Sequence, residues 1–273
     1  MLWATGFIGA KAGIPYAEPF TFLTWRFYIV ALLLGLIAFA TKAPFPKNRV
    51  DILHIAVAGL LVQGVYLGGV FAAISLGVSA SVSAIIVGVQ PLLTALLAVR
   101  ILGENLKPRQ WLGFILGLLG LMLVVTREFS WQADDMFGLV LCAASLVAIA
   151  AGTIYQKRYC ANLDLRSGSM IQFLAAGTMT LVIALLFEQR DVIWNSQFIF
   201  ALTWLCLVLS VGAISLFFIL IRRGKASRVA ALFYLVPPVT TLMAWAFFGE
   251  VLPPMAIVGM ILSATGVALV VKK

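Results

Sequence analysis

Residues 80–125 read ASVSAIIVGVQPLLTALLAVRILGENLKPRQWLGFILGLLGLMLVV, and residues 226–271 read ASRVAALFYLVPPVTTLMAWAFFGEVLPPMAIVGMILSATGVALVV. The two stretches align without a gap at an offset of 146 residues, with 18 identities in 46 pairs. Chance would give about 5 identities, because few residue types dominate so apolar a composition. The same offset carries Lys11 to Lys157 and Phe27 to Phe173. The chain therefore contains an internal repeat.

The composition indicates a membrane protein. The chain is 63% hydrophobic and 11% charged, with a mean hydropathy of +1.10, whereas a soluble domain carries about a quarter charged residues. Helices satisfy their own backbone groups where no water is present, so we predict an all-α integral membrane protein whose partner is the lipid bilayer. The net charge of +9 comes from Lys and Arg in short loops between spans, where cations fix the orientation in the membrane. The basic charge therefore does not indicate nucleic-acid binding.

Hydropathy and length predict ten membrane-spanning helices, most of them near the 20 residues needed to cross the hydrocarbon. The expected spans are 1–14, 19–41, 52–76, 79–102, 108–126, 136–157, 167–187, 198–221, 226–248 and 254–271. Each repeat holds five spans, and because five is odd the second repeat must cross the membrane in the opposite sense. The predicted domains are residues 1–127 and an inverted copy, 136–273. Inverted repeats are typical of carriers that alternate access around a midplane site.

The first span is short, since only about 14 residues precede Pro15. Its repeat mate begins near Met136, which corresponds to ten residues before position 1. We therefore expect about ten residues to be missing from the first helix, and no signal-peptide cleavage site follows the apolar run.

The distribution of cations predicts the orientation. A cytoplasmic N-terminus places 15 of the 19 Lys and Arg residues in inner loops, and only Arg127 and Arg190 in outer loops. These inner cations are Lys42, Lys47, Arg49, Arg100, Lys107, Arg109, Lys157, Arg158, Arg166, Arg222, Arg223, Lys225, Arg228, Lys272 and Lys273. The bias predicts that both termini are cytoplasmic, and we expect a bacterial inner (plasma) membrane.

Several motifs resemble the EamA family of the drug/metabolite transporter superfamily. The opening LWATGFI of residues 2–8 with Lys11 resembles its first helix, and FLTWRF of residues 22–27 resembles its second, with the family's arginine at Arg26. The stretch from Ala80 to Gly120, repeated at 226–271, resembles the fourth and fifth helices. The resemblance covers the whole chain and implies ten helices in two inverted halves. It also implies transport, often export, of amino acids or other small metabolites.

Two cations lie inside spans, where burial costs several kcal/mol and favours a function. Lys11 is one turn from the outer end of its helix, so it pairs with a substrate carboxylate or extends to the outer headgroups. Arg26 lies about two turns into its span and has Gln172 as its repeat mate. A structural or gating role and a direct transport role both remain open for Arg26. Glu18 or a backbone carbonyl is its expected partner.

Other polar and aromatic residues predict a substrate pathway. Interrupted helices at corresponding positions of two halves point to a carrier's binding site, and Pro91 and Pro237 occupy such positions. We expect them to meet near the midplane. Gln63 and Tyr66, three residues apart, are expected on one helix face. The predicted substrate-binding residues are Trp3, Lys11, Gln63, Tyr66, Gln90, Pro91, Thr94, Tyr234, Pro237 and Thr240.

Other chemistry lacks a sequence signal. The chain has no G-x-x-x-x-G-K-[ST] phosphate loop and a single histidine, His54, so we expect no enzyme activity, cofactor or metal. Glu104 and Glu250 follow helix ends and are interpreted as loop carboxylates. Because no Asp or Glu lies deep in a span, facilitated diffusion or exchange is favoured over proton antiport.

The sequence thus predicts a secondary carrier that moves a small metabolite, an amino acid or related compound, outward by alternating access. The alternatives are a membrane scaffold or sensor built on the same fold, and an integral membrane enzyme. A scaffold would not need paired prolines in mid-helix, and an enzyme would need clustered reactive groups.

Overall fold

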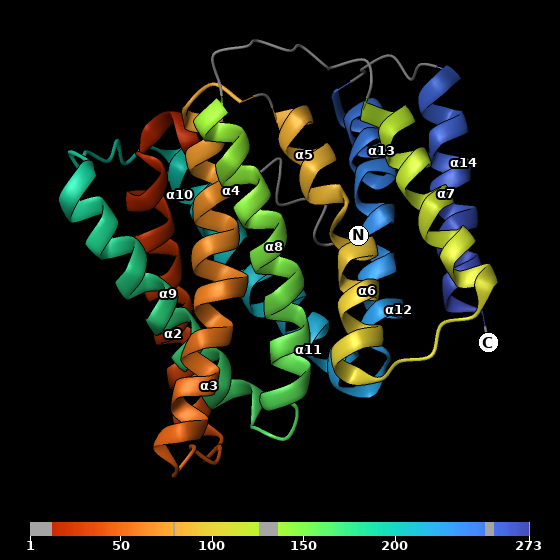
Figure 1. Ribbon diagram of the computed structural model, residues 1–273. Helices are drawn as coiled ribbons and strands as arrows, with labels where there is room; N and C mark the ends of the chain where they lie inside the picture. The colour runs from red at the N-terminus through yellow and green to blue at the C-terminus, as the bar shows by residue number, and fades with distance from the viewer. Residues whose placement is uncertain (1–12, 79, 126–135, 249–253, 273) are drawn as a thin grey trace.

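The computed structural model describes residues 13–78, 80–125, 136–248 and 254–272. Within these residues the chain is helical and holds no β-strand, only an isolated bridge between Ala17 and Val192. Figure 1 shows the helices arranged as one bundle. The α-helices are α2 Pro19–Ala40, α3 Arg49–Gly59, α4 Tyr66–Ser75, α5 Ala80–Gly88, α6 Gln90–Leu102, α7 Pro108–Val125, α8 Met136–Tyr159, α9 Leu165–Phe187, α10 Ser196–Trp204, α11 Ile214–Arg223, α12 Ala226–Ala231, α13 Val236–Phe248 and α14 Pro254–Val271.

In the described part of the chain, eight helical stretches are long and apolar enough to cross a membrane, and Pro108–Val124 is a shorter apolar helix. Two of the eight combine several elements: Arg49–Ser75 and Ser196–Arg223. These findings confirm an all-helical, multi-pass membrane protein. The expected first span lies mostly in residues 1–12, outside the described residues, so the number ten stays a prediction.

Helices are interrupted at positions related by the repeat offset. A π-helical segment, η3 (Leu60–Val65), joins α3 to α4, and a second, η5 (Leu205–Ala213), joins α10 to α11. Adding 146 to residues 60–65 gives 206–211, which lie within η5. A turn at Val89 separates α5 from α6, and the 3₁₀ segment η6 (Leu232–Leu235) separates α12 from α13. Each of these two breaks lies just before the proline that removes a helical N–H, Pro91 or Pro237.

Glycines bring α7 and α14 into close contact, side by side in Figure 1. A Cβ atom added to Gly113 would lie 2.6 Å from the carbonyl oxygen of Gly266, and one added to Gly120 would lie 2.5 Å from that of Gly259. The offset of 146 makes Gly259 the counterpart of Gly113 and Gly266 the counterpart of Gly120. Each glycine therefore touches the counterpart of the other, which is a reciprocal contact.

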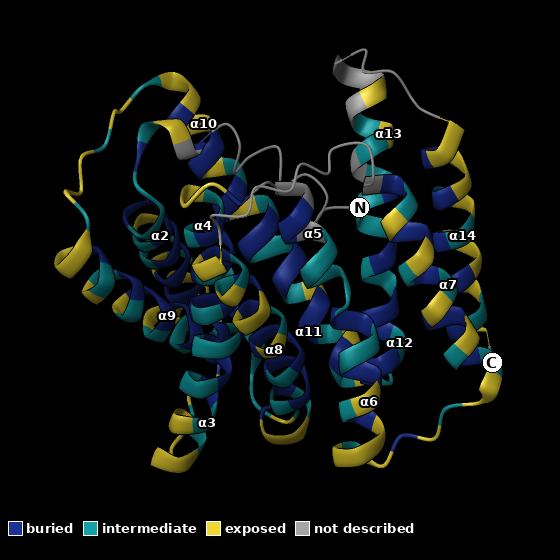
Figure 2. Cartoon of the chain, turned by 45° about the horizontal axis from the view of Figure 1, so that its top comes forward, coloured by how far each residue is buried: buried dark blue, intermediate teal, exposed yellow. Residues whose placement is uncertain are grey.

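Apolar side chains fill the interior and also cover the outside of the bundle. The largest core cluster contains Phe22, Phe27, Phe173 and Phe198, all fully buried. Figure 2 shows buried positions facing the interior and exposed positions on the outer surfaces of α9 and α14. Exposed large apolar side chains such as Phe187 on α9 fit a surface covered by lipid rather than water.

Candidate functional site

The structure buries most of the predicted substrate-binding residues that it describes. Gln63 and Thr94 are 0% exposed, while Tyr234, Gln90 and Tyr66 are at most 8% exposed. Pro91 is buried and Pro237 is half-buried. Trp3, Lys11 and the side chain of Thr240 lie outside the described residues.

Arg26 is buried between α2 and η5. Its side chain is 3% exposed, and its Nε donates a hydrogen bond to the Ser210 hydroxyl at 3.1 Å. The Cys206 thiol donates to the carbonyl oxygen of Arg26 at 3.7 Å. The expectation that Glu18 pairs with Arg26 is wrong. The Glu18 carboxylate instead accepts a hydrogen bond from the backbone N–H of Arg190 at 2.9 Å. α2 is therefore joined to η5 through a hydroxyl and a thiol.

Gln172 on α9 occupies the corresponding place in the second repeat. Its Nε2 donates to the Oε1 of Gln156 on α8 at 2.7 Å, within the buried interior. The residue that corresponds to Ser210 is Gly64 in η3, which offers no hydroxyl. A polar side chain thus occupies both positions, but only the first repeat carries a charge there.

Gln63 lies in η3 with neither amide atom hydrogen-bonded to a described residue. Burying a polar group without a partner costs about 1–3 kcal/mol. The Gln63 amide can therefore still form hydrogen bonds in the interior with a group other than the described residues. The expectation that Gln63 and Tyr66 share a face assumed α-helical rotation. Both side chains are buried, but the π-helical segment up to Val65 changes that rotation. A shared cavity for the pair stays a prediction.

Gln90 and Thr94 pair with each other on α6. The Gln90 Nε2 donates to the Thr94 hydroxyl at 3.1 Å, one turn away. Tyr234 in η6 presses its ring against Gly117 of α7, where an added Cβ would lie 2.3 Å from the ring. The Tyr234 hydroxyl is buried without a described partner. The expected meeting of Pro91 and Pro237 stays a prediction, since α6 packs along α12, and α13 along α7 and α14.

The Glu104 carboxylate, which the sequence predicted only as a loop residue, binds the start of a helix in the second repeat. It follows α6, as expected, but is 7% exposed and caps α12 of the second repeat. Its oxygens accept from the Ala226 N–H at 2.7 Å, the Ser227 N–H at 3.3 Å and the Ser227 hydroxyl at 2.5 Å. Lys157 lies 3.8 Å away and donates to the carbonyl of Gly224. We name this group, Glu104, Lys157, Ala226 and Ser227, the Glu104 cluster.

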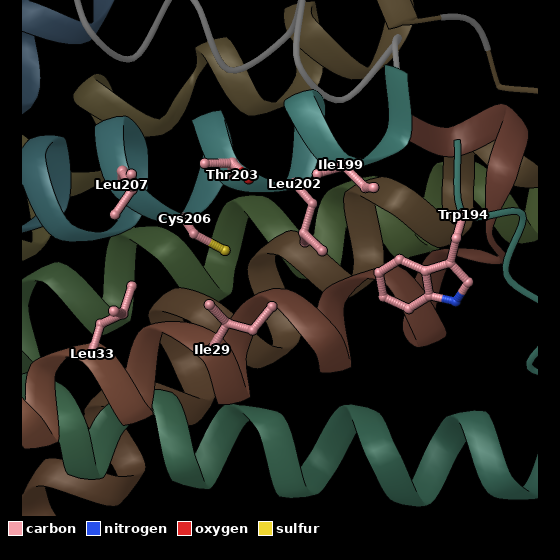
Figure 3. A pocket seen from close by; sticks show the side chains of 8 residues that line it. All are labelled: Ile29, Leu33, Trp194, Ile199, Leu202, Thr203, Cys206 and Leu207. Atoms are coloured by element: carbon pink, nitrogen blue, oxygen red, sulfur yellow. The ribbon is translucent and has the colours of Figure 1, made fainter. Parts of the chain in front are cut away.

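Sequence reasoning missed the Glu104 cluster, Ser210 and Gln156 as partners, because each contact joins residues far apart in the chain. One signal was available: Glu104, Lys157 and Ser227 all take part in identities at the 146 offset. Within the described residues, an apolar groove of about 270 Å³ lies between α2 and the α10–η5 segment (Figure 3). Its lining includes Cys206 and none of the predicted substrate-binding residues.

The fold and the interior define a helical multi-pass membrane protein whose largely apolar interior contains several buried polar side chains. The family model of EamA-like transporters matches residues 1–126 and again 136–272. The chain therefore belongs to the EamA-like transporter family.

Individual relatives agree with that assignment. The uncharacterised transporter YvbV of Bacillus subtilis is 27% identical, covering 99% of this chain and 88% of its own. A Salmonella typhimurium protein named "probable amino-acid metabolite efflux pump" is 25% identical, covering 97% and 90%. One solved crystal structure, 19% identical, matches with a TM-score of 0.84 over 98% of this chain and 93% of its own. The last similarity shows the fold.

Proposed function

We propose that this transporter is a secondary carrier that exports an amino acid or a related small metabolite across the bacterial inner membrane by alternating access. Both termini are cytoplasmic in this proposal, and the second repeat is inverted relative to the first. The name of the Salmonella typhimurium relative supports the substrate class, and the inner-membrane name of the 24% identical YedA of Escherichia coli supports the location. The cation-rich loops support the orientation.

The reciprocal contact of α7 with α14 carries the proposal. Gly113 meets Gly266 and Gly120 meets Gly259, as expected when a two-fold axis in the membrane plane relates the halves. The helix breaks are also related by the offset of 146 residues. The break at η3 corresponds to η5, and the break at Val89 corresponds to η6. Carriers of this kind bind substrate where broken helices of the two halves face each other.

We place the substrate pathway along these breaks. Gln63 and Tyr234 supply buried polar atoms without described partners, and Gln90, Thr94 and Tyr66 are buried beside the same breaks. Trp3, Lys11, Pro91, Pro237 and Thr240 complete the proposed pathway.

The Glu104 cluster serves as the cytoplasmic gate in this scheme. It joins the loop after α6 to the start of α12, and α6 packs along α12. The corresponding helices, α13 and α5, form no comparable interface in the described part of the chain. This difference supports a conformation closed towards the cytoplasm, and the contacts of Glu104 must break before substrate enters from inside.

Counterflow in proteoliposomes tests the proposal. Vesicles carrying the purified protein are loaded with a mixture of the twenty common amino acids, and uptake of each radiolabelled amino acid is followed. We expect transient accumulation of at least one, reduced in Gln63→Ala and Tyr234→Ala at matched protein levels. Leu207→Ala, on the exposed side of η5, is the matched control. Ligand-induced thermal stabilisation without counterflow would instead favour the scaffold or sensor.

A further inference from the structure

We propose that Arg26 recognises a carboxylate of the substrate, so that the transported class is carboxylic acids and amino acids rather than their amides or amines. This inference rests on the proposed carrier function. It assigns to Arg26 a direct ligand contact, where the sequence favoured a structural or gating role.

Arg26 is a buried cation that forms no ion pair in the part of the chain that the structure describes. It is the eighth residue of α2, which begins at Pro19, so at 1.5 Å per residue it lies about 10 Å along the helix. No described carboxylate lies within 4.0 Å of its guanidinium. Residues 1–12 contain no Asp or Glu. Because a buried unpaired charge costs several kcal/mol, a group at this depth without a neutralising partner indicates a function.

Within the described residues, most of the guanidinium donors have no acceptor. Arginine carries five N–H donors in a planar fork, and the described residues accept from one of them, the Nε–H bound to Ser210. That contact engages only the Nε atom. It leaves the two terminal nitrogens, Nη1 and Nη2, which together match the two oxygens of a carboxylate.

The second repeat shows whether the helix packing around Arg26 needs a cation. Phe27 and Phe173 are corresponding residues, both 0% exposed, with ring centroids 5.8 Å apart. The neighbour of Phe173 is Gln172, a neutral residue whose Nε2 donates to Gln156, while its Oε1 has no partner among the described residues. The same helix packing is therefore built without a cation at this place, so the charge of Arg26 is not a requirement of the fold.

A purely structural Arg26 would need only to join α2 to η5 through Ser210. Its loss would then lower stability, with equal effects on every substrate. A carboxylate-binding Arg26 predicts instead a selective loss, in which acids are affected and their amides are not. Charge-assisted hydrogen bonds to a carboxylate contribute enough to give at least a tenfold preference.

The test compares each transported amino acid with its primary amide and its decarboxylated amine, by competition for counterflow in proteoliposomes. Wild type should prefer the acid at least tenfold. Arg26→Gln, which copies Gln172, should reduce that preference to near one, and Arg26→Lys should retain part of it because the charge remains without the fork. Arg223→Gln, an exposed arginine at the end of α11, is the control and should keep the wild-type preference.

The outcomes separate the two proposals. If wild type transports amides or amines as well as acids, the carrier function stands and the role of Arg26 is wrong. An Arg26→Gln variant that keeps the tenfold preference also overturns it. If wild type transports none of these compounds, the proposed carrier function fails for this substrate class, and the inference fails with it. Should Arg26→Gln not fold, the wild-type preference and Arg26→Lys still decide.

Discussion

Arg26 on α2 and Gln172 on α9 stand at the same place in the two repeats, yet their surroundings differ. α2 packs against η5, where Ser210 accepts from Arg26, and α9 packs against η3, where Gly64 replaces that serine. Gln172 turns to Gln156 instead. The architecture therefore keeps a polar side chain at both places, whereas the charge and its hydroxyl partner belong to one repeat only.

The two π-helical segments extend the difference. η5 supplies Ser210 and Cys206, both engaged with Arg26, while η3 holds Gln63 with an unpartnered buried amide. π-helical turns inside α-helices often mark functional sites. Here the same backbone irregularity holds a hydroxyl and a thiol bound to Arg26 in one repeat, and an unpartnered buried amide in the other.

Placing a cation at the corresponding position of the second repeat should have a large effect on stability. Gln172→Arg would place a second cation in a small hollow that Arg222 already lines, where Gly59 lies directly on the Gln172 backbone. The carboxylate of that hollow, Asp164, is already paired with Arg166. We expect a loss of about 3–5 kcal/mol, typical of an uncompensated buried charge. Thermal unfolding in detergent and yield of monodisperse protein measure it. Wild-type stability would mean that either repeat accepts a cation, and the argument from Gln172 would lapse.

A second pair of corresponding positions is Gly117 on α7 and Ser263 on α14. The Cβ of an alanine at Gly117 would lie 2.3 Å from the Tyr234 ring, so Gly117→Ala should overpack the site and cost about 1–3 kcal/mol. Gly168→Ala on α9 is the matched control, because nothing lies within 4 Å of its added Cβ and alanine favours the helix. Equal melting temperatures for the two variants would contradict the packing of Tyr234 on Gly117.

The Glu104 cluster links the two repeats, so removing its carboxylate tests how much this link contributes to stability. Glu104→Ala removes the acceptor of the Ala226 and Ser227 N–H groups, and losing such a cap costs about 0.5–2 kcal/mol. Glu104→Gln retains an acceptor oxygen and should cost less. Maleimide labelling of Val229→Cys on α12, buried in the present conformation, should increase in Glu104→Ala if the contact closes the cytoplasmic end. Unchanged labelling would remove the gate from the scheme.

The sequence anticipated the fold better than the site, for physical reasons. Repeat identities at Gly113, Gly120 and Pro91 were visible, because close helix contact and helix interruption each require particular residue types. The π-helical segments η3 and η5 have no such marker, since they arise from tertiary packing. The Arg26–Ser210 contact joins residues 184 apart, and composition or periodicity contains no information on such a pair.

The two corresponding helices also differ at their N-termini, and this difference yields the smallest effect. α2 is capped by Glu188 from the end of α9, which accepts from the Phe20 and Thr21 N–H groups at 2.8 and 2.7 Å. α9 is capped locally by Asp164, which accepts from the backbone and side chain of Arg166. The hydrogen bond from the Arg166 side chain, with those from the backbone, holds the pKa of Asp164 below its usual value.

A lowered folded-state pKa fixes the sign of the pH dependence. The stability that the ionised Asp164 contributes is fully present above its unfolded pKa of about 3.9, and is lost as the pH falls through the lower folded value. Asp164→Asn retains the N-cap acceptor but not the charge, so it should melt slightly below wild type at pH 7. The difference between the two melting temperatures should shrink as the pH falls below about 4. A difference that stays constant from pH 7 to pH 3 would assign the cap's contribution to hydrogen-bond geometry alone, and not to the carboxylate charge.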